Sequence, residues 1–101
     1  MIKRLKLHGE LVDLLGTRNV YFQPPESIKI RYPAIVYSRE RIDEKFADNG
    51  TYNKTIGYKI VVIDEDPDSE IVEKVSNFKG TRFVAHYTSD GLNHDVFSLN
   101  Y

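Results

Sequence analysis

The sequence predicts an α+β domain in which two helices pack on a largely antiparallel sheet of four or five strands. Residues 58–75 hold the strongest strand pattern and the strongest helix pattern of the chain, in direct succession. A second helical pattern precedes all the strand patterns, and two strand patterns joined by a tight turn end the chain. The expected order of elements is therefore α-β-β-β-α-β-β.

Residues 2–15 are predicted to form the first helix because apolar side chains recur there at helical spacing. Gly16 follows directly and can adopt the left-handed conformation that often ends helices. The basic residues Lys3, Arg4 and Lys6 are expected on the solvated side of this helix. The apolar face comprises Leu7, Leu11, Leu14 and Leu15, extended by Ile2 and Leu5.

The first two predicted strands are short, and a charged segment follows the second of them. Residues 19–23 are rich in strand-forming side chains and end at two prolines, which cannot donate ladder hydrogen bonds. Residues 34–38 are more apolar and predict a buried strand. Residues 39–50 change in character, since seven of these twelve are charged and the segment ends in Asp-Asn-Gly. This composition is typical of a loop, which we expect to become ordered only against a neighbouring molecule.

The central part of the chain predicts a long strand, a turn and the second helix. Residues 51–63 form the strand, with a bend or bulge near Gly57 because glycine inside a strand commonly marks such a place. Pro67 prevents the strand from running on into a helix. Either Asp68 or Ser69 can cap the helix that follows. Its apolar residues recur at a spacing of about 3.6 and are Ile71, Val72, Val75 and Phe78.

The C-terminal part predicts a β-hairpin. Residues 82–88 and 94–101 both read as strands, and Ser-Asp-Gly at 89–91 turns the chain between them. The last strand contains no proline to interrupt it, so we expect it to be an exposed sheet edge that pairs with a neighbouring subunit. One face of the first strand of this hairpin is expected to carry Phe83, Ala85 and Tyr87.

Length and composition fit a single domain, residues 1–101. The 41% hydrophobic content can supply a core, and the absence of cysteine excludes disulfides and thiolate metal sites. Fourteen basic and 15 acidic residues give a net charge of −1, which argues against sequence-specific nucleic-acid binding. No apolar run is long enough for a membrane span, so we expect a protein without a membrane partner that is made in the cytoplasm.

Three alternating acids, Asp64, Asp66 and Asp68, are the main candidates for metal chemistry. They depart from a calcium-binding loop because Pro67 precedes the third acid and Val75 stands where a glutamate is required. The favoured interpretation is a turn whose acids lie at the positive end of the following helix. A small metal-dependent nuclease that uses these three carboxylates is the alternative.

The histidines do not form a recognisable catalytic set. His94 and Asp95 are adjacent on a predicted strand, so their side chains point to opposite faces. His86 and His94 could be cross-strand neighbours, but two histidines alone do not complete a zinc site. The sequence contains no nucleophile elbow, phosphate-binding loop or dinucleotide fingerprint. We therefore expect no enzymatic activity, no cofactor and no resident metal.

Four segments distinguish residues 20–101, namely YPAIVY at 32–37, KFADN at 45–49, IDEDPDS at 63–69 and LNHDVF at 92–97. Together they resemble the tail terminator or tail completion proteins, small tail proteins of phages and prophages of Gram-positive bacteria that lie at the head-to-tail joint. The last two segments are the most specific. The resemblance implies an α+β subunit of a ring, commonly a hexamer, that stops growth of the tail tube and joins the tail to the head.

The same resemblance implies further copies of the chain, the tail tube protein, and a head-completion, connector or sheath protein as partners. The expected location is the head-proximal end of the tail in the virion, reached from the host cytoplasm. Headless tail-like bacteriocin particles carry related components, and a head-completion adaptor at the same joint is an alternative. The candidate contact residues are Lys45, Phe46, Asp48, Asn49, Asn93, His94, Asp95 and Tyr101.

Overall fold

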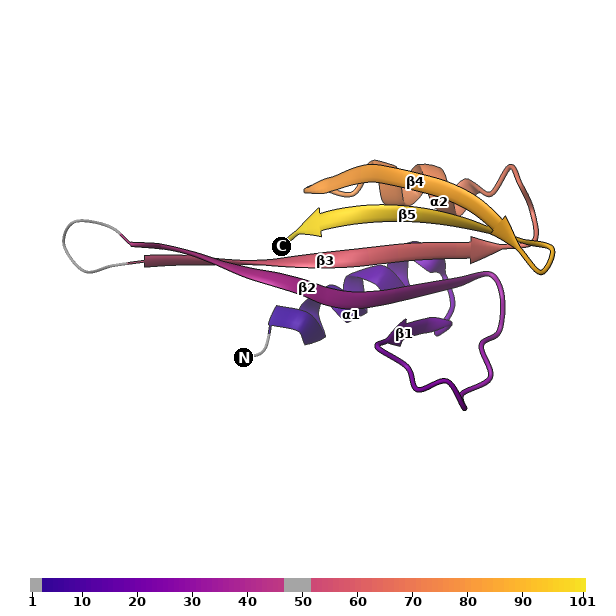
Figure 1. Ribbon diagram of the computed structural model, residues 1–101, viewed down its shortest axis with the longest axis horizontal. Coiled ribbons are helices and arrows are strands. Elements are labelled where there is room, and N and C mark those ends of the chain that lie inside the picture. The colour runs from indigo at the N-terminus through magenta and orange to yellow at the C-terminus, as the bar shows by residue number, and fades with distance from the viewer. Residues whose placement is uncertain (1–2, 47–51) are drawn as a thin grey trace.

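The computed structural model describes residues 3–46 and 52–101 and confirms the α+β class (Figure 1). Two helices and five strands follow one another in the predicted order α-β-β-β-α-β-β. The elements are α1 (Lys3–Leu15), β1 (Val20–Phe22), β2 (Ala34–Phe46), β3 (Tyr52–Asp64), α2 (Glu70–Ser76), β4 (Thr81–Ser89) and β5 (Leu92–Asn100).

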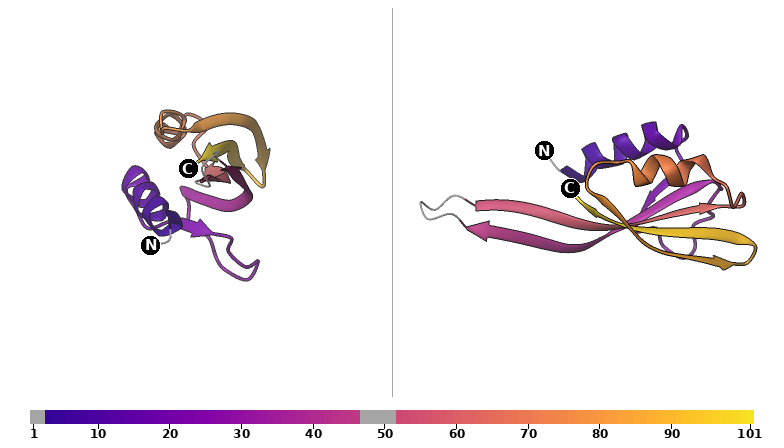
Figure 2. Two further views of the ribbon diagram at one scale, coloured as in Figure 1. Left: turned by 90° about the vertical axis from the view of Figure 1, so that its left-hand side faces the viewer. Right: turned by 90° about the horizontal axis from the view of Figure 1, so that it is seen from above.

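The strands form one sheet in the order β1-β2-β3-β5-β4. β1 runs parallel to β2, whereas all other neighbouring strands are antiparallel. Figure 2 shows that α1 and α2 lie on the same face of this sheet. The opposite face therefore has no helix over it in the described part of the chain.

The core lies between the two helices and the helix-facing side of the sheet. On each central strand every second residue enters it, as expected for the period of two along a β-strand. The buried cluster comprises Leu7, Leu11, Leu15, Val20, Ile35, Tyr37, Tyr58, Ile60, Val62, Val75, Phe97 and Leu99.

The first helix ends as predicted, but its apolar face is narrower than expected. The Gly16 amide donates to the Val12 carbonyl at 2.9 Å, and its φ of +84° is left-handed. Leu5 was expected to extend the apolar face and is instead 55% exposed. It lies two residues from Leu7, a rotation of about 200° at 3.6 residues per turn, so it faces away from the core. Ile2 lies outside the described residues.

Arg4 and His8 form hydrogen bonds with the hydroxyl group of the buried Tyr37. The Tyr37 oxygen lies 2.7 Å from His8 Nδ1 and accepts from Arg4 Nη1 at 3.3 Å. The Arg4 guanidinium also lies 4.4 Å from the centre of the Phe22 ring. Arg4 is thus not simply on a solvated face as expected. Burial, and then the nearby Arg4 charge, lower the pKa of His8.

The predicted loop over residues 39–50 is wrong for its first part, because β2 continues through Phe46. Residues 41–46 pair with residues 52–57 of β3 as an antiparallel ribbon that projects beyond the sheet (Figure 1). Pairing between the two backbones needs no apolar face, so the charged composition did not exclude a strand. The remainder of the predicted loop, residues 47–50, lies outside the described residues.

The irregularity expected near Gly57 is present, but the extra residue is on the partner strand. Arg39 pairs with Tyr58 and Arg41 pairs with Gly57, which leaves Glu40 as the additional residue of a β-bulge. Such a bulge increases the local twist and marks the base of the projecting ribbon.

Ser69, rather than Asp68, caps α2. The Ser69 Oγ accepts from the Ile71 amide at 3.3 Å. In the preceding turn, Asp64 Oδ1 accepts from the Asp66 amide at 3.1 Å, and Asp66 Oδ1 accepts from the Asp68 amide at 2.9 Å. The alternating acids thus build two consecutive Asx-turns that lead into the helix.

The C-terminal hairpin forms as predicted, but β5 is not a sheet edge. Asp90 and Gly91 have φ of +53° and +77°, the left-handed pair typical of a two-residue hairpin turn. β5 lies between β3 and β4, so β4 is the edge strand. The expectation that the last strand is the free edge was wrong because residues 93–100 return to pair with β3.

A second bulge also changes the predicted faces of β4. Phe83 pairs with Phe97, and Ala85 pairs with Val96, so Val84 is an additional residue. Since Phe97 and Val96 are successive in β5, Phe83 and Ala85 lie on opposite faces rather than on one.

Candidate functional site

The structure does not bring the predicted contact residues together. Lys45 and Phe46 lie at the far end of β2, where their backbones pair with Asn53 and Tyr52. Residues 93–95 lie at the other end of β3, near Asp64. Asp64 lies twelve positions beyond Tyr52 along β3, about 40 Å at the rise of a strand. Asp48 and Asn49 lie outside the described residues.

Asn93 holds the turn after β3. Its side-chain amide donates to the carbonyl oxygens of Asp64 and Glu65, both at 3.3 Å. These bonds fix the position of the turn relative to β5. The structure therefore gives Asn93 an internal role.

His94 and Asp95 each contact a residue of β4. The His94 ring stacks on the Tyr87 ring at a centroid distance of 4.6 Å and an interplanar angle of 11°. Asp95 Oδ1 lies 2.8 Å from His86 Nδ1. Because His86 pairs with Asp95 and Tyr87 with His94, the two histidines are not the cross-strand pair that we considered. Both contacts join the strands of the hairpin.

Tyr101 ties the end of the chain to α1 and β3. Its hydroxyl donates to Glu10 Oε1 at 2.7 Å, and its amide donates to the Ile56 carbonyl at 3.0 Å. Burial, followed by the Glu10 carboxylate, raises the pKa of Tyr101 to about 12. This residue also has an internal role.

The carboxylates of Asp64 and Asp66 accept hydrogen bonds from backbone amides of their own turn. Within residues 3–46 and 52–101, no group of three or more histidine, cysteine, aspartate or glutamate side chains is arranged to hold a metal ion. The nuclease alternative therefore receives no geometric support from these acids.

The exposed edge of β4 is a surface that the sequence did not identify. Every residue of this strand except Thr81 is exposed. Large apolar side chains are among them, with Phe83 54%, Val84 57% and Tyr87 49% exposed. A strand edge that has no proline or lysine and carries exposed apolar side chains is a site at which another chain can pair.

The projecting ribbon is the second such surface. β1 covers only residues 35–37 of β2, while β5 reaches Gly57 on β3 and Tyr101 extends this pairing to Ile56. Beyond these points the ribbon has two strands and two free edges. At its base Arg39, Glu40 and Arg41 are exposed, and Ile42 is 48% exposed.

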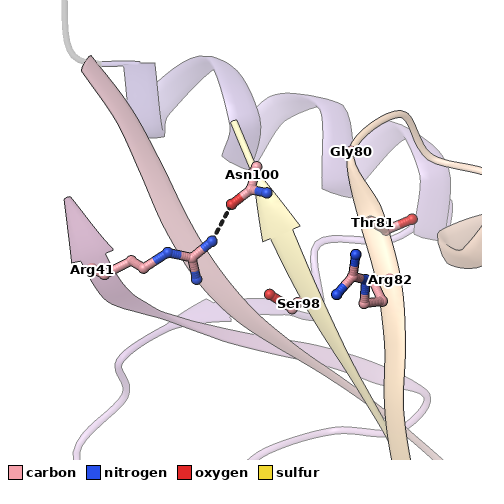
Figure 3. A pocket seen from close by; sticks show the side chains of 6 residues that line it. All are labelled: Arg41, Gly80, Thr81, Arg82, Ser98 and Asn100. Atoms are coloured by element: carbon pink, nitrogen blue, oxygen red, sulfur yellow. Dashed lines mark hydrogen bonds between the residues drawn. The ribbon is translucent and has the colours of Figure 1, made fainter. Parts of the chain in front are cut away.

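A polar pocket lies where the base of the ribbon meets the start of β4 (Figure 3). Its volume is about 290 Å³, and its lining residues are Arg41, Gly80, Thr81, Arg82, Ser98 and Asn100. These residues come from β2, the turn before β4, β4 and β5. Figure 3 shows Arg41 and Arg82 on opposite sides of Ser98.

Gly57 allows Arg41 to reach this pocket. The Arg41 side chain crosses β3 at Gly57 and donates from Nη2 to Asn100 Oδ1. A Cβ at residue 57 would lie 2.7 Å from Arg41 Nη1 and 2.8 Å from its Cγ. No local sequence pattern predicts this pocket, because only the order of the strands in the sheet brings Arg41, Arg82 and Asn100 together.

Neither a protein-family model nor a curated protein matches this chain. Among the described residues, no helix has the length and apolar character needed to cross a membrane.

Proposed function

We propose that the protein is a structural subunit of a homo-oligomeric ring at the head-proximal end of a phage tail or tail-like particle. There it stops growth of the tail tube and joins the tail to the head. The observation that carries the assembly role is the pair of unpaired strand surfaces, the β4 edge and the projecting ribbon. The assignment to a tail is supported by the four sequence segments that resemble tail terminator proteins.

The β4 edge favours assembly because its backbone is unpaired and it carries exposed apolar side chains, although a bulge at Val84 interrupts its regular pairing. It contains no proline and no lysine, and its described side chains include three large exposed apolar groups. Its backbone amides and carbonyls on the outer side have no strand beside them. A neighbouring chain would satisfy those groups and cover the apolar side chains.

The ribbon favours assembly because a two-stranded hairpin by itself is marginally stable in water. It accounts for much of the elongated shape of the molecule, whose principal extents are 52 × 25 × 23 Å (Figure 1). Packing of the ribbon of one subunit along the β4 edge of the next would stabilise both surfaces. Since the two surfaces differ, this contact is heterologous and closes into a ring when the rotation between subunits permits it.

The proposed partners are further copies of this chain, the tail tube protein, and a connector, head-completion or sheath protein. Six copies is the ring order that the family resemblance suggests. The proposed role needs no catalytic step and no cofactor.

The test is to locate the protein in purified particles by mass spectrometry and electron cryo-microscopy. We expect ring density with six-fold symmetry at the head-proximal end of the tail, into which the five-stranded subunit fits. A ring on the head side of the joint would instead support the head-completion adaptor. Absence of the protein from the particle would refute the proposed function.

A further inference from the structure

From the geometry we infer that the pocket between Arg41 and Arg82 binds a carboxylate from the acidic turn of a second copy of the chain. The acidic turn is defined as residues 64–70, which carry Asp64, Glu65, Asp66, Asp68 and Glu70. This inference rests on the proposed function, because it specifies the polar contact by which successive ring subunits join.

The pocket has the composition of an anion site. Among the lining residues that the structure describes, two are arginines and none is acidic. The Arg82 side chain makes no hydrogen bond or ion pair with any described residue. Arg41 is positioned by Asn100. A guanidinium group binds a carboxylate through two parallel hydrogen bonds, so two such groups facing one pocket favour an oxyanion.

The remaining groups of the pocket limit what can bind there. The Thr81 hydroxyl donates to the Phe78 carbonyl oxygen at 2.7 Å, so its hydrogen is not available to a carboxylate. The Ser98 side chain lies between the two arginines, where a small polar group of the ligand can meet it (Figure 3). Glu40 and Lys59 line a neighbouring depression of about 480 Å³ rather than this pocket.

The acidic turn has complementary properties. Asp64 and Asp66 are used to form the turn, whereas Glu65, Asp68 and Glu70 are exposed and make no ion pair within the described part of the chain. Like charges at this density repel one another. A guanidinium group from another molecule would relieve that repulsion.

The two surfaces lie too far apart to meet within one molecule. Asn100 pairs with Gly57 and Asn93 pairs with Asp64. The pocket and the turn are thus seven positions apart along β3, about 23 Å at the rise of a strand. The start of β4, which lines the pocket, lies at the end of the body from which the ribbon projects, and the turn after β3 lies at the other end (Figure 1).

This placement agrees with the contact proposed between subunits. β4 runs from Thr81 beside the pocket to Ser89, which pairs with Leu92 near the acidic turn. A ribbon that follows the β4 edge of the next subunit with its base beside Ser89 of that subunit would bring the acidic turn of that subunit to the ribbon's own base. The Arg41 and Arg82 pocket lies at that base.

The experiment uses charge reversal on the full chain, with self-association measured by analytical ultracentrifugation over a range of protein and salt concentrations. We expect Arg82→Glu to weaken association at least about tenfold, because it places like charges against each other in the contact. Arg18→Glu is the matched control, since Arg18 is exposed and distant from the pocket in the sequence. Arg82→Gln serves if the reversed variant fails to fold.

The reciprocal variant replaces Glu65 and Asp68 by lysine and leaves the two turn-forming aspartates in place. We expect it to weaken association as well, while Asp13→Lys/Glu26→Lys, an exposed pair with the same charge change, does not. Combining Arg82→Glu with the two lysine substitutions restores opposite charges at residue 82, while Arg41 keeps its charge, so we expect association to recover in part relative to either parent variant. Recovery of association in this triple variant would support the inference, and continued loss would overturn it.

A second measurement covers the case in which the free chain associates too weakly for ultracentrifugation. In an Arg82→Lys variant, a carbodiimide should join the new amine to Glu65 or Asp68 of another copy as an amide. Mixing ¹⁴N- and ¹⁵N-labelled chains identifies such links as intermolecular by mass spectrometry. Links between labelled and unlabelled chains at these positions support the inference, whereas their absence at all concentrations and in the purified particle overturns it.

The outcomes separate this inference from the proposed function. Intermolecular links in a chain that is absent from tail particles would preserve the contact and refute the tail role. A six-fold ring in the particle without these links would preserve the tail role and refute the contact. Protection of Arg82 by short duplex DNA, in place of the acidic turn, would also overturn the inference.

Discussion

Replacement of Gly57 by alanine tests whether the Arg41 side chain can be displaced without affecting the folding of the sheet. The new Cβ would lie 2.7 Å from Arg41 Nη1 and 2.8 Å from its Cγ and Cζ, distances that force the side chain to move. The three atoms nearest to this Cβ all belong to the flexible Arg41 side chain, so movement of that side chain rather than of the β3 backbone should relieve the clash. The guanidinium should leave Asn100, and the pocket should lose one of its two cations.

The expected free energies of this substitution nearly cancel. Alanine in a strand interior is favoured over glycine by about 0.5–1 kcal/mol through backbone entropy. The lost hydrogen bond from Arg41 to Asn100 costs about 0.5–1.5 kcal/mol, at the lower end because the pair is exposed. We therefore expect the free energy of unfolding in urea to change by less than about 1 kcal/mol. Self-association should nevertheless weaken, as we also expect for Arg82→Glu.

A double-mutant cycle checks the reasoning. In an Arg41→Ala background the obstruction is absent, so Gly57→Ala should stabilise the protein by about 0.5–1 kcal/mol. A loss of more than about 2 kcal/mol in that background would show that residue 57 must be glycine for the backbone itself. The proposed role of Gly57 in admitting Arg41 would then be wrong.

Three further predictions concern the cap, the edge and the chain end. Ser69→Ala should lower the free energy of unfolding by about 1 kcal/mol, whereas Asp68→Ala should change it by less than about 0.5 kcal/mol; an equal loss in both would contradict the cap assignment. Val84→Lys should leave that free energy within about 0.5 kcal/mol of its original value and reduce self-association in ultracentrifugation, because lysine blunts a strand edge; unchanged association would argue against β4 pairing. The pKa of Tyr101 is raised to about 12 from an unfolded value near 10, so its contribution is present below pH 10 and is lost as pH rises from about 10 to 12. Tyr101→Phe should therefore show a shallower loss of stability over this range in urea titrations, and an identical slope would exclude the shift.

The parts of the fold that the sequence predicted depend on local physical chemistry. Helical spacing of Leu7 and Leu11, the left-handed Gly16 and the Asp90-Gly91 turn each act within a few residues, and all are present. The α+β class follows from them because amphipathic helices must cover one face of a sheet.

The parts that were missed depend on pairing between distant segments. The charged residues 39–46 were expected to form a loop, yet they are a strand because the backbone of β3 lies beside them. The identity of the edge strand depends on whether residues 93–100 pair with β3 or remain outside, which the pattern of β5 alone does not decide. The pocket was missed for the same reason, since strand order alone brings Arg41 to Arg82.

The buried core does not include the proposed contact residues. This explains why variants of Arg82 and of the acidic turn should remain folded. All twelve residues of the buried cluster come from the helices or from the strands within the body of the sheet, and neither Arg82 nor any residue of the acidic turn is among them. Exposed charges of this kind contribute little to the stability of a monomer, typically less than about 1 kcal/mol. When a second molecule covers them, the same charges are desolvated and their complementarity decides which surfaces can join. Loss of association without loss of stability in the Arg82 and acidic-turn variants is therefore the result that distinguishes an assembly surface from ordinary solvent-exposed charge.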